Sequence, residues 1–221
     1  MFLKKIIKHV FKTKRNNFIG FDKYRKKGAY HWDEVESNSD YRSLIEKIKC
    51  FIDQGSVVLD VGCGDGAYLG YLSSSIGQGF GVDADSTAVK LANSKFDERG
   101  IENCKAECLT IGEAKETFEK TGDKFDVVYS ADVIEHLPDP AELLSLAVSV
   151  IKKDGLVIIG TPLYISDELI SPYHVKEFSK QEMRSMIEPF LIIIEEAVMP
   201  LKRKDKKIYQ EGYYFAICKP L

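Results

Sequence analysis

Two hydrophobic periods alternate along the chain from residue 56 onward. Short apolar runs rich in valine, isoleucine and phenylalanine are separated by stretches in which apolar residues recur at helical spacing. The runs predict strands at 57–61, 79–83, 125–130 and 155–160, and the stretch NCKAE at 103–107 could form a short third strand. The stretches between them predict helices at 66–76, 85–99, 113–120 and 140–152. This alternation is typical of βαβ units in a mostly parallel sheet with helices on both faces.

The end of the chain departs from that alternation. A predicted helix at 180–189 ends at a proline, and two apolar runs at 190–199 and 212–220 follow it. A charged stretch joins these two runs, which predicts an antiparallel hairpin at one side of the sheet. Within the parallel part, Asp139 and Pro140 predict the start of a helix, and Lys152, Lys153 and Gly155 predict its end.

The first 18 residues differ in composition from the rest. Lysines and an arginine alternate at helical spacing with apolar residues, and no acid appears before Asp22. This pattern predicts a basic amphipathic helix, either lying on an anionic membrane surface or packed on the domain. We therefore divide the chain into an N-terminal helical lid or arm at 1–50 and a main domain at 51–221.

Composition narrows the class of protein. The 221 residues are 44% hydrophobic and 29% charged, with a formal net charge of -3. A phosphate-binding nucleic-acid protein is usually more basic, so this charge disfavours that role. The five cysteines show no CxxC spacing, which predicts reduced intracellular thiols in a cytoplasmic protein. No apolar run approaches the roughly 18 residues of a membrane span.

The stretch VLDVGCGDGAYLGYL at 58–72 carries the clearest motif. A strand runs into Gly62, Gly64 and Gly66, and a helix follows. Glycines let backbone approach a ligand closely, and the following helix points its N-terminus at that ligand. The next strand ends at Asp83, where an acid can accept both ribose hydroxyls of a nucleoside cofactor.

Dinucleotides and S-adenosylmethionine both fit such a turn. Gly62, Gly64 and Ala67 also match the G-x-G-x-x-A form of a dinucleotide site. Asp60, however, lies two residues before the first glycine, and a carboxylate suits the cationic methionine half better than a pyrophosphate. The chain also has too little length left for a second domain that could hold a hydride acceptor.

The motifs VLDVGCGDG, GVDAD, FDVVYSADVIEHLPDP and IKKDGLVIIGTP occur in an order that resembles class I S-adenosylmethionine-dependent methyltransferases. The resemblance runs from about residue 56 to the C-terminus. It implies an α/β fold, a Rossmann-like doubly wound seven-stranded sheet that is mostly parallel and ends in an antiparallel hairpin. The cofactor-binding candidates that it implies are Asp60, Gly62, Gly64, Gly66, Asp83, Ala84, Ser130 and Asp132. The family usually has an acid near the adenine, for which Glu107 is the nearest candidate.

Candidate catalytic groups follow the fourth and fifth strands. Asp132, Glu135 and His136 would share one face if their segment makes a helical turn, and His174 lies in the loop after the fifth strand. Together these four side chains could bind Mg²⁺ or Mn²⁺. Alternatively His136 or His174, with Glu135 beside it, could accept the acceptor's proton without a metal. A third possibility is catalysis by alignment alone.

The same run resembles two branches of the family. One is the small-RNA 2′-O-methyltransferases, whose metal site implies Asp132, Glu135, His136 and His174 as ligands here. The other is the ubiquinone-biosynthesis O-methyltransferases, which carry a similar EVxEH run. This chain has an aspartate where the first branch has a glutamate, and no paired histidines precede His174.

An aromatic cluster precedes the first predicted strand. Tyr30, His31 and Trp32 could stack against a ring of the acceptor or could anchor the N-terminal arm. Tyr164 and Tyr173 could line the same pocket. The sequence as a whole predicts O-methylation of a small molecule, a glycan or a lipid-linked intermediate. The alternatives are a metal-dependent RNA 2′-O-methyltransferase, a non-catalytic S-adenosylmethionine-binding module and a dinucleotide-dependent oxidoreductase.

Overall fold

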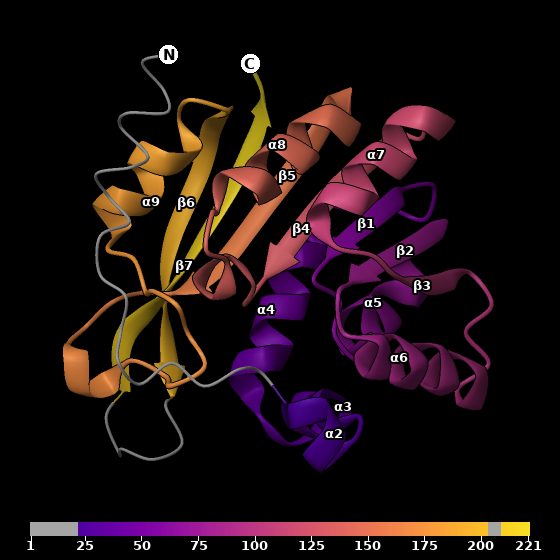
Figure 1. The fold of residues 1–221 in the computed structure, drawn as a ribbon, viewed down its shortest axis with the longest axis horizontal. Coiled ribbons are helices and arrows are strands. Elements are labelled where there is room, and N and C mark those ends of the chain that lie inside the picture. Colours follow the sequence, from indigo (N-terminus) through magenta and orange to yellow (C-terminus); the bar gives the residue numbers. More distant parts are fainter. Residues whose placement is uncertain (1–21, 203–208) are drawn as a thin grey trace.

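A computed structural model describes residues 22–202 and 209–221 and shows one seven-stranded sheet (Figure 1). The strands are β1 (Val57–Val61), β2 (Gln78–Asp83), β3 (Cys104–Cys108), β4 (Phe125–Ala131), β5 (Ile151–Pro162), β6 (Leu191–Lys202) and β7 (Tyr209–Pro220). Their order across the sheet is β3-β2-β1-β4-β5-β7-β6. The first five strands are parallel, and β7 pairs antiparallel with both β5 and β6. The predicted fold class, including the C-terminal hairpin, is confirmed.

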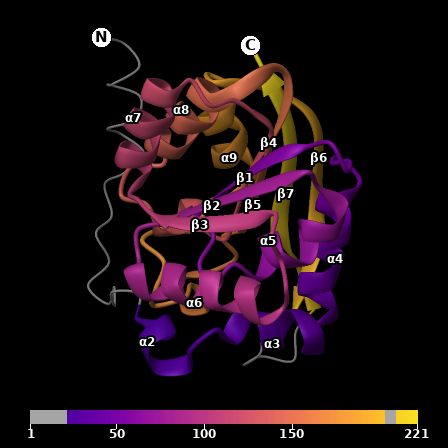
Figure 2. The ribbon, with the colours of Figure 1, turned by 90° about the vertical axis from the view of Figure 1, so that its right-hand side faces the viewer.

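Helices cover both faces of the sheet (Figure 2). They are α2 (Lys23–Lys27), α3 (Tyr30–Ser37), α4 (Ser39–Lys49), α5 (Ala67–Leu72), α6 (Ser86–Glu98), α7 (Ile111–Thr121), α8 (Ala141–Val150) and α9 (Lys180–Ile187). Single 3-10 turns occupy Ser73–Ser75, Ile134–His136 and Asp167–Leu169. One apolar cluster lies under α7, α8 and α9, and a second lies under α3, α4, α5 and α6. Each face of the sheet is therefore buried by its own layer of helices.

Strand order fixes where a ligand can bind. The chain runs outward from β1 through β2 to β3 and then returns to place β4 on the other side of β1. Because the connections leave β1 and β4 in opposite directions, a crevice opens beyond the carboxyl ends of these two strands. The glycine turn follows β1, and the DVIEHL segment follows β4, so both motifs meet at that crevice.

One predicted helix end is wrong. Helix α8 ends at Val150, and Lys152, Lys153 and Gly155 lie inside β5. Lys152 pairs with Asp126 of β4 at 2.8 Å. A Cβ at Gly155 would lie 2.8 Å from the Asp126 carbonyl oxygen, so this glycine permits close approach of the two strands. At the other end of the helix, Asp139 accepts a hydrogen bond from the Ala141 backbone at 3.0 Å.

The start of the chain is described from residue 22 onward. The predicted amphipathic helix at 1–18, with its membrane contact, lies outside the described residues. In the part described, α3 and α4 contribute Trp32, Leu44, Ile45 and Ile48 to the apolar cluster on their face of the sheet. The division at residue 50 stays a prediction. No helix among the described residues is long and apolar enough to cross a membrane.

Two helical glycines make a matched test of packing. A Cβ at Gly70 in α5 would collide with the indole of Trp32, whereas a Cβ at Gly112 in α7 meets nothing within 4 Å. We expect Gly70→Ala to lower the free energy of unfolding by about 1–3 kcal/mol because it overpacks this contact. Gly112→Ala should be neutral or stabilising by up to about 1 kcal/mol. Urea unfolding measures the free energy of unfolding of both variants. An equal change in the two would contradict the close packing of Trp32 on Gly70.

Candidate functional site

The glycine turn after β1 has the conformation that its sequence predicts. Gly62, Gly64 and Gly66 have φ angles of 80°, 55° and 75°, a region that disfavours other residues. A Cβ at Gly62 would collide with Val133, and one at Gly66 would lie 2.7 Å from the Phe96 ring. The Gly64 N–H donates to the Asp83 carboxylate at 2.9 Å. The turn is thus tied directly to the end of β2.

Two cavities open at this turn. The small cavity, of about 290 Å³, is lined by Asp83 and Ala84 after β2 and by Leu109 and Ile111 after β3. The large cavity, of about 760 Å³, extends from Asp60 on β1 under α2, α3 and α4. Four residues line both cavities: Tyr24, Gly62, Asp132 and His136. The two cavities therefore adjoin, and we call the place where they meet the junction.

The predicted cofactor residues occupy different places around these cavities. Asp83 and Ala84 line the small cavity, and Asp83 also accepts the Asp85 N–H at 2.8 Å. Ser130 lines neither cavity, because its hydroxyl donates to the Val61 carbonyl at 2.9 Å and joins β4 to β1. Glu107 is also outside the linings and pairs with Lys105 at 2.8 Å. Apolar side chains, rather than an acid, stand where the third strand meets the small cavity.

Asp60 lies at the floor of the large cavity. Its side chain is buried and accepts the Tyr129 hydroxyl at 2.7 Å. Burial raises the pKa of Asp60 to about 8, against the opposing effect of this hydrogen bond. A buried carboxyl group with so few donors favours a cationic ligand beside it.

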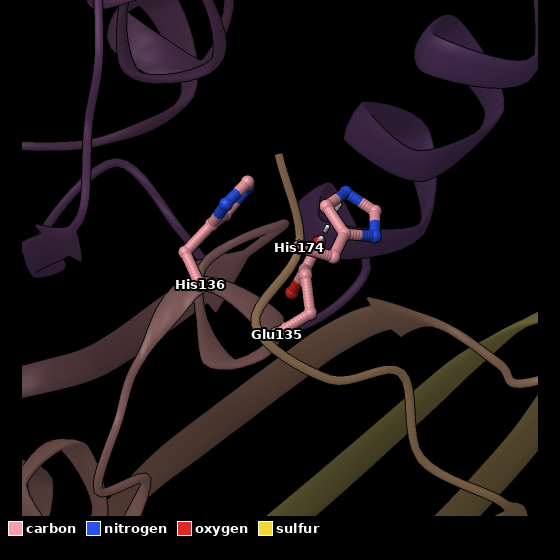
Figure 3. Close-up of side chains that lie close together, drawn as sticks. All are labelled: Glu135, His136 and His174. Carbon is pink, nitrogen blue, oxygen red and sulfur yellow. Dashed lines mark ion pairs between the residues drawn. The ribbon is translucent and has the colours of Figure 1, made fainter. Parts of the chain in front are cut away.

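Glu135, His136 and His174 form an acid–imidazole cluster at the edge of the large cavity (Figure 3). One carboxylate oxygen and one ring nitrogen from each histidine lie within 4.8 Å of one another. Thr161 of β5 donates its hydroxyl to Glu135 Oε2 at 2.9 Å. Glu135 Oε1 is buried, has no hydrogen-bond partner among the described residues, and lies 4.0 Å from His174 Nε2. Burial, and then the charge of Asp132, raise the pKa of Glu135 well above its usual range.

Both imidazoles of the cluster are oriented through their Nδ1 atoms. The Nδ1 of His136 lies 2.9 Å from the Tyr173 carbonyl oxygen, which can act only as a hydrogen-bond acceptor. The Nδ1 of His174 lies 2.8 Å from Glu177 Oε1. When Nδ1 donates in this way, the lone pair of each ring is on Nε2. Burial, followed by the charge of His174, lowers the pKa of His136 to about 4.

Glu177 is a site residue that the sequence analysis missed. Its side chain is buried and orients His174 from three residues further along the chain. The signal was present as an acid at His-x-x-Glu spacing in HVKEFS. The backbone also brings this loop to the cluster, because the Val175 and Lys176 N–H groups donate to the Glu135 carbonyl at 2.8 and 3.1 Å.

Asp132 does not share a helical face with Glu135 and His136. The 3-10 turn contains Ile134–His136 alone, and Asp132 lies before it with a left-handed φ of 59°. Its N–H donates to the Gly160 carbonyl at 3.0 Å. Among the described residues, the three-member cluster forms without Asp132, which instead lies at the junction. Burial raises the pKa of its carboxyl group, while His31 and His174 lower it.

Aromatic side chains form part of the wall of the large cavity. Tyr30 and His31 line it with ring centroids 4.0 Å apart, and Tyr173 lines it from the loop after β5. Trp32 is instead an anchor, 2% exposed, whose indole N–H donates to the Asp65 carbonyl at 2.8 Å. Tyr164 is 43% exposed and outside the lining.

The profile of a family described as "Methyltransferase domain" matches residues 52–213, which is more than half of the chain. The chain belongs to this methyltransferase domain family. The matched region contains the glycine turn, the DVIEHL segment and the loop that carries His174. Family membership and the sheet together confirm the predicted class I methyltransferase fold.

The chain is also similar to individual methyltransferases in sequence and in structure. The chain is 29% identical over 135 residues to a probable S-adenosylmethionine-dependent methyltransferase of Mycobacterium tuberculosis, covering 59% of this chain and 46% of that protein. It is 27% identical over 154 residues to the ubiquinone biosynthesis O-methyltransferase of Actinobacillus pleuropneumoniae, covering 63% and 62%. The chain thus spans less than two thirds of either relative. A crystal structure of a SAM-dependent methyltransferase from Aquifex aeolicus has a TM-score of 0.65 at 17% identity, covering 91% and 100%.

The raised pKa of Asp60 predicts a pH dependence of methyltransferase stability. Its pKa is about 8 in the folded chain against 3.8 ordinarily, so the folded state holds an extra proton between these values. The wild-type free energy of unfolding should therefore fall as pH rises from about 4 to about 8. Asp60→Asn keeps an acceptor for Tyr129 and removes this titration. Between pH 5 and 8.5, the free energy of unfolding of the variant, measured in urea, should rise relative to that of the wild type by on the order of a few kcal/mol. An equal pH dependence in the two proteins would contradict the raised pKa of Asp60.

Proposed function

We propose that this chain transfers a methyl group from S-adenosylmethionine to a hydroxyl oxygen of a small, ring-containing acceptor. The observation that carries this proposal is the junction, where a nucleoside-sized cavity beside Asp83 meets a larger cavity that ends at the acid–imidazole cluster. A cofactor that extends across the junction would present its reactive centre to an acceptor in the large cavity. The family and its named relatives support the same reaction class.

The residues present fit this cofactor. Asp83 lines the small cavity with a carboxylate that can accept ribose hydroxyls, and Leu109 and Ile111 offer apolar contact to a base. Gly62 lines both cavities at the junction, and Asp60 lines the large cavity, where a cationic methionine half beside it would favour its ionised form. When bound, S-adenosylmethionine supplies an activated methyl group on a sulfonium and leaves as S-adenosylhomocysteine.

His174 is placed to accept the proton of the attacking hydroxyl. Its Nδ1 is oriented by the buried Glu177 at 2.8 Å, which leaves the lone pair on Nε2 beside Glu135 Oε1. As the oxygen–methyl bond forms and the sulfur–methyl bond breaks, the hydroxyl proton passes to His174 Nε2. Glu177 stabilises the imidazolium that results.

The walls of the large cavity support a neutral, ring-shaped acceptor. Tyr30, His31 and Tyr173 offer flat apolar surfaces with polar edges. At the reacting end Glu135 is buried and Asp132 is half-buried. A phosphate or carboxylate at that end would lie beside these two carboxyl groups, neither of which offers it a positive charge, and this disfavours an anionic nucleophile. Phenolic rings and sugars, free or lipid-linked, share the required chemistry.

A divalent cation at the acid–imidazole cluster is the second candidate. Glu135, His136 and His174 offer one oxygen and two nitrogen ligands, and each histidine is oriented by an outer acceptor, as is usual for metal ligands. This donor set suits Mn²⁺ better than Mg²⁺, because two of its three ligands are imidazoles. A bound cation would lower the pKa of an acceptor hydroxyl.

Cofactor binding tests the first part of the proposal. We expect calorimetric titration to detect S-adenosylhomocysteine binding, and Asp83→Asn to weaken it about tenfold or more through lost charged hydrogen bonds. Asp126→Asn is a matched control, because Asp126 accepts the Val57 N–H at 2.9 Å at the opposite end of β1. Equal affinities in all three proteins, or no binding to folded wild type, would contradict the proposed cofactor site.

Turnover tests the second part. With labelled S-adenosylmethionine and a panel of catechol and methyl glucoside, we expect methylation of a ring hydroxyl. Glu177→Gln should lower kcat about 10- to 100-fold and leave S-adenosylhomocysteine affinity unchanged. Glu188→Gln, which breaks an exposed ion pair with Arg184, is the control.

Chelation separates the two candidates for the cluster. Unchanged activity in EDTA supports His174 as the proton acceptor without a metal. Loss in EDTA with recovery in Mn²⁺ would instead show a metal-dependent reaction. Methylation of no panel member would contradict the proposed acceptor class.

A further inference from the structure

Tyr24 of α2 lies where the two cavities meet. It is one of the four residues that line both, together with Gly62, Asp132 and His136. A cofactor with its nucleoside beside Asp83 and its methionine half beside Asp60 must cross from one cavity to the other here. In S-adenosylmethionine the atom that links these two halves is the sulfonium sulfur. The junction residues are therefore the ones that surround the reactive centre.

The position of Tyr24 is fixed by close packing on the glycine turn. The residue is 7% exposed, and a Cβ at Gly64 would collide with its hydroxyl. Gly64 is thus required both for its φ angle of 55° and for the space that the phenol occupies. This contact places the aromatic side chain of Tyr24 directly over the turn that follows β1.

A second set of contacts joins the α2–α3 segment to the same turn. The Tyr24 hydroxyl lies 3.4 Å from His31 Nδ1, and that nitrogen lies 3.3 Å from Asp65 Oδ1. The His31 N–H also donates to Asp65 Oδ2 at 2.9 Å. Asp65 is fully buried between Gly64 and Gly66, so these contacts fix α3 to the turn and hold Tyr24 at the junction.

The charges around the junction favour a cation. Asp132 lies at the junction itself, with Asp60 and Asp83 in the two cavities on either side. Lys23 and Lys27 of α2 add positive charge to the large cavity, but their ammonium groups lie over its aromatic rings, 4.8 Å from the centre of Tyr173 and 5.5 Å from that of Tyr30, respectively. An aromatic face attracts a cation that lies within about 6 Å of its centre, most strongly where water is excluded.

We propose that Tyr24 is the aromatic contact of the cofactor's sulfonium and makes the site prefer S-adenosylmethionine over S-adenosylhomocysteine. The assignment rests on the proposed cofactor, and it adds a role that none of the sequence motifs carries. Methyl transfer converts the charged sulfonium into a neutral thioether, so the contact is lost as the product forms. Tyr24 would then bind the substrate form of the cofactor more tightly than its product.

The test is the ratio of two dissociation constants, measured by calorimetry on the full chain. Tyr24→Leu should raise the Kd of S-adenosylmethionine about 3- to 10-fold more than that of S-adenosylhomocysteine. Tyr24→Phe keeps the ring and should keep the ratio. Tyr71→Leu is the matched control, because Tyr71 packs on Trp32 with ring centroids 5.4 Å apart and lies outside both cavity linings.

A purely structural role gives a different result. If Tyr24 only packs the α2–α3 segment, Tyr24→Leu weakens both ligands equally or neither, and an unchanged ratio overturns the proposal. Tyr24→Met repeats the comparison with another long apolar side chain should the leucine variant not fold. If wild type binds neither ligand, the proposed cofactor is wrong. If it binds both and the ratio does not change in the variant, only the proposed role of Tyr24 is wrong.

Discussion

Burial of carboxyl groups at one edge of the sheet is the constraint on which this site depends. Asp60 and Glu135 are at most 3% exposed. Asp60 accepts a hydrogen bond from the Tyr129 hydroxyl, and Glu135 accepts one from the Thr161 hydroxyl. A neutral donor compensates a buried charge only in part, so burial raises the pKa of both groups. The folded chain therefore carries an electrostatic cost that a bound cation relieves. The proposed sulfonium at the junction and the alternative of a divalent ion at the cluster would each provide such relief.

The elements around the site act as a frame for these groups. Strand β4 delivers Asp132 in a left-handed conformation, and the 3-10 turn after it delivers Glu135 and His136. The loop after β5 returns along the same edge and is fixed there by hydrogen bonds to the Glu135 carbonyl. Side chains of α2, α3 and the β5 loop form walls of the large cavity, and under the proposed function these elements select the acceptor. This division between a fixed floor and variable walls is common where one fold serves many substrates.

The sequence predicted the sheet well because strand period, glycine turn and strand-end acids all depend on local pattern. Asp83, Gly62 and Gly64 lie where the motif placed them, and β1, β4 and β5 are where valine and isoleucine cluster. The predicted helix end at Lys152 and Lys153 was wrong. Lysines that follow an apolar helix can belong to its last turn or to the start of the next strand, and the local sequence does not distinguish the two cases. Lys152 is held in β5 by Asp126, a partner 26 positions away.

Residues defined by tertiary contacts were harder to predict. Glu177 matters through its burial against His174, and Trp32 is an anchor because Gly70 leaves space for its indole. The left-handed φ of Asp132 also has no local signal, because aspartate tolerates that conformation but also adopts the ordinary ones. Each of these features depends on a partner that sequence spacing alone does not identify.

The insertion of β7 between β5 and β6 affects how the protein is made. β6 has no pairing in the sheet except with β7, which follows it in the sequence, and β7 also carries Tyr213 into the large cavity. During synthesis on the ribosome, β1 to β5 can associate as they emerge, but β6 must wait for a later strand. The large cavity is therefore completed only after the rest of the sheet, so a nascent chain has the glycine turn before it has the closed cavity.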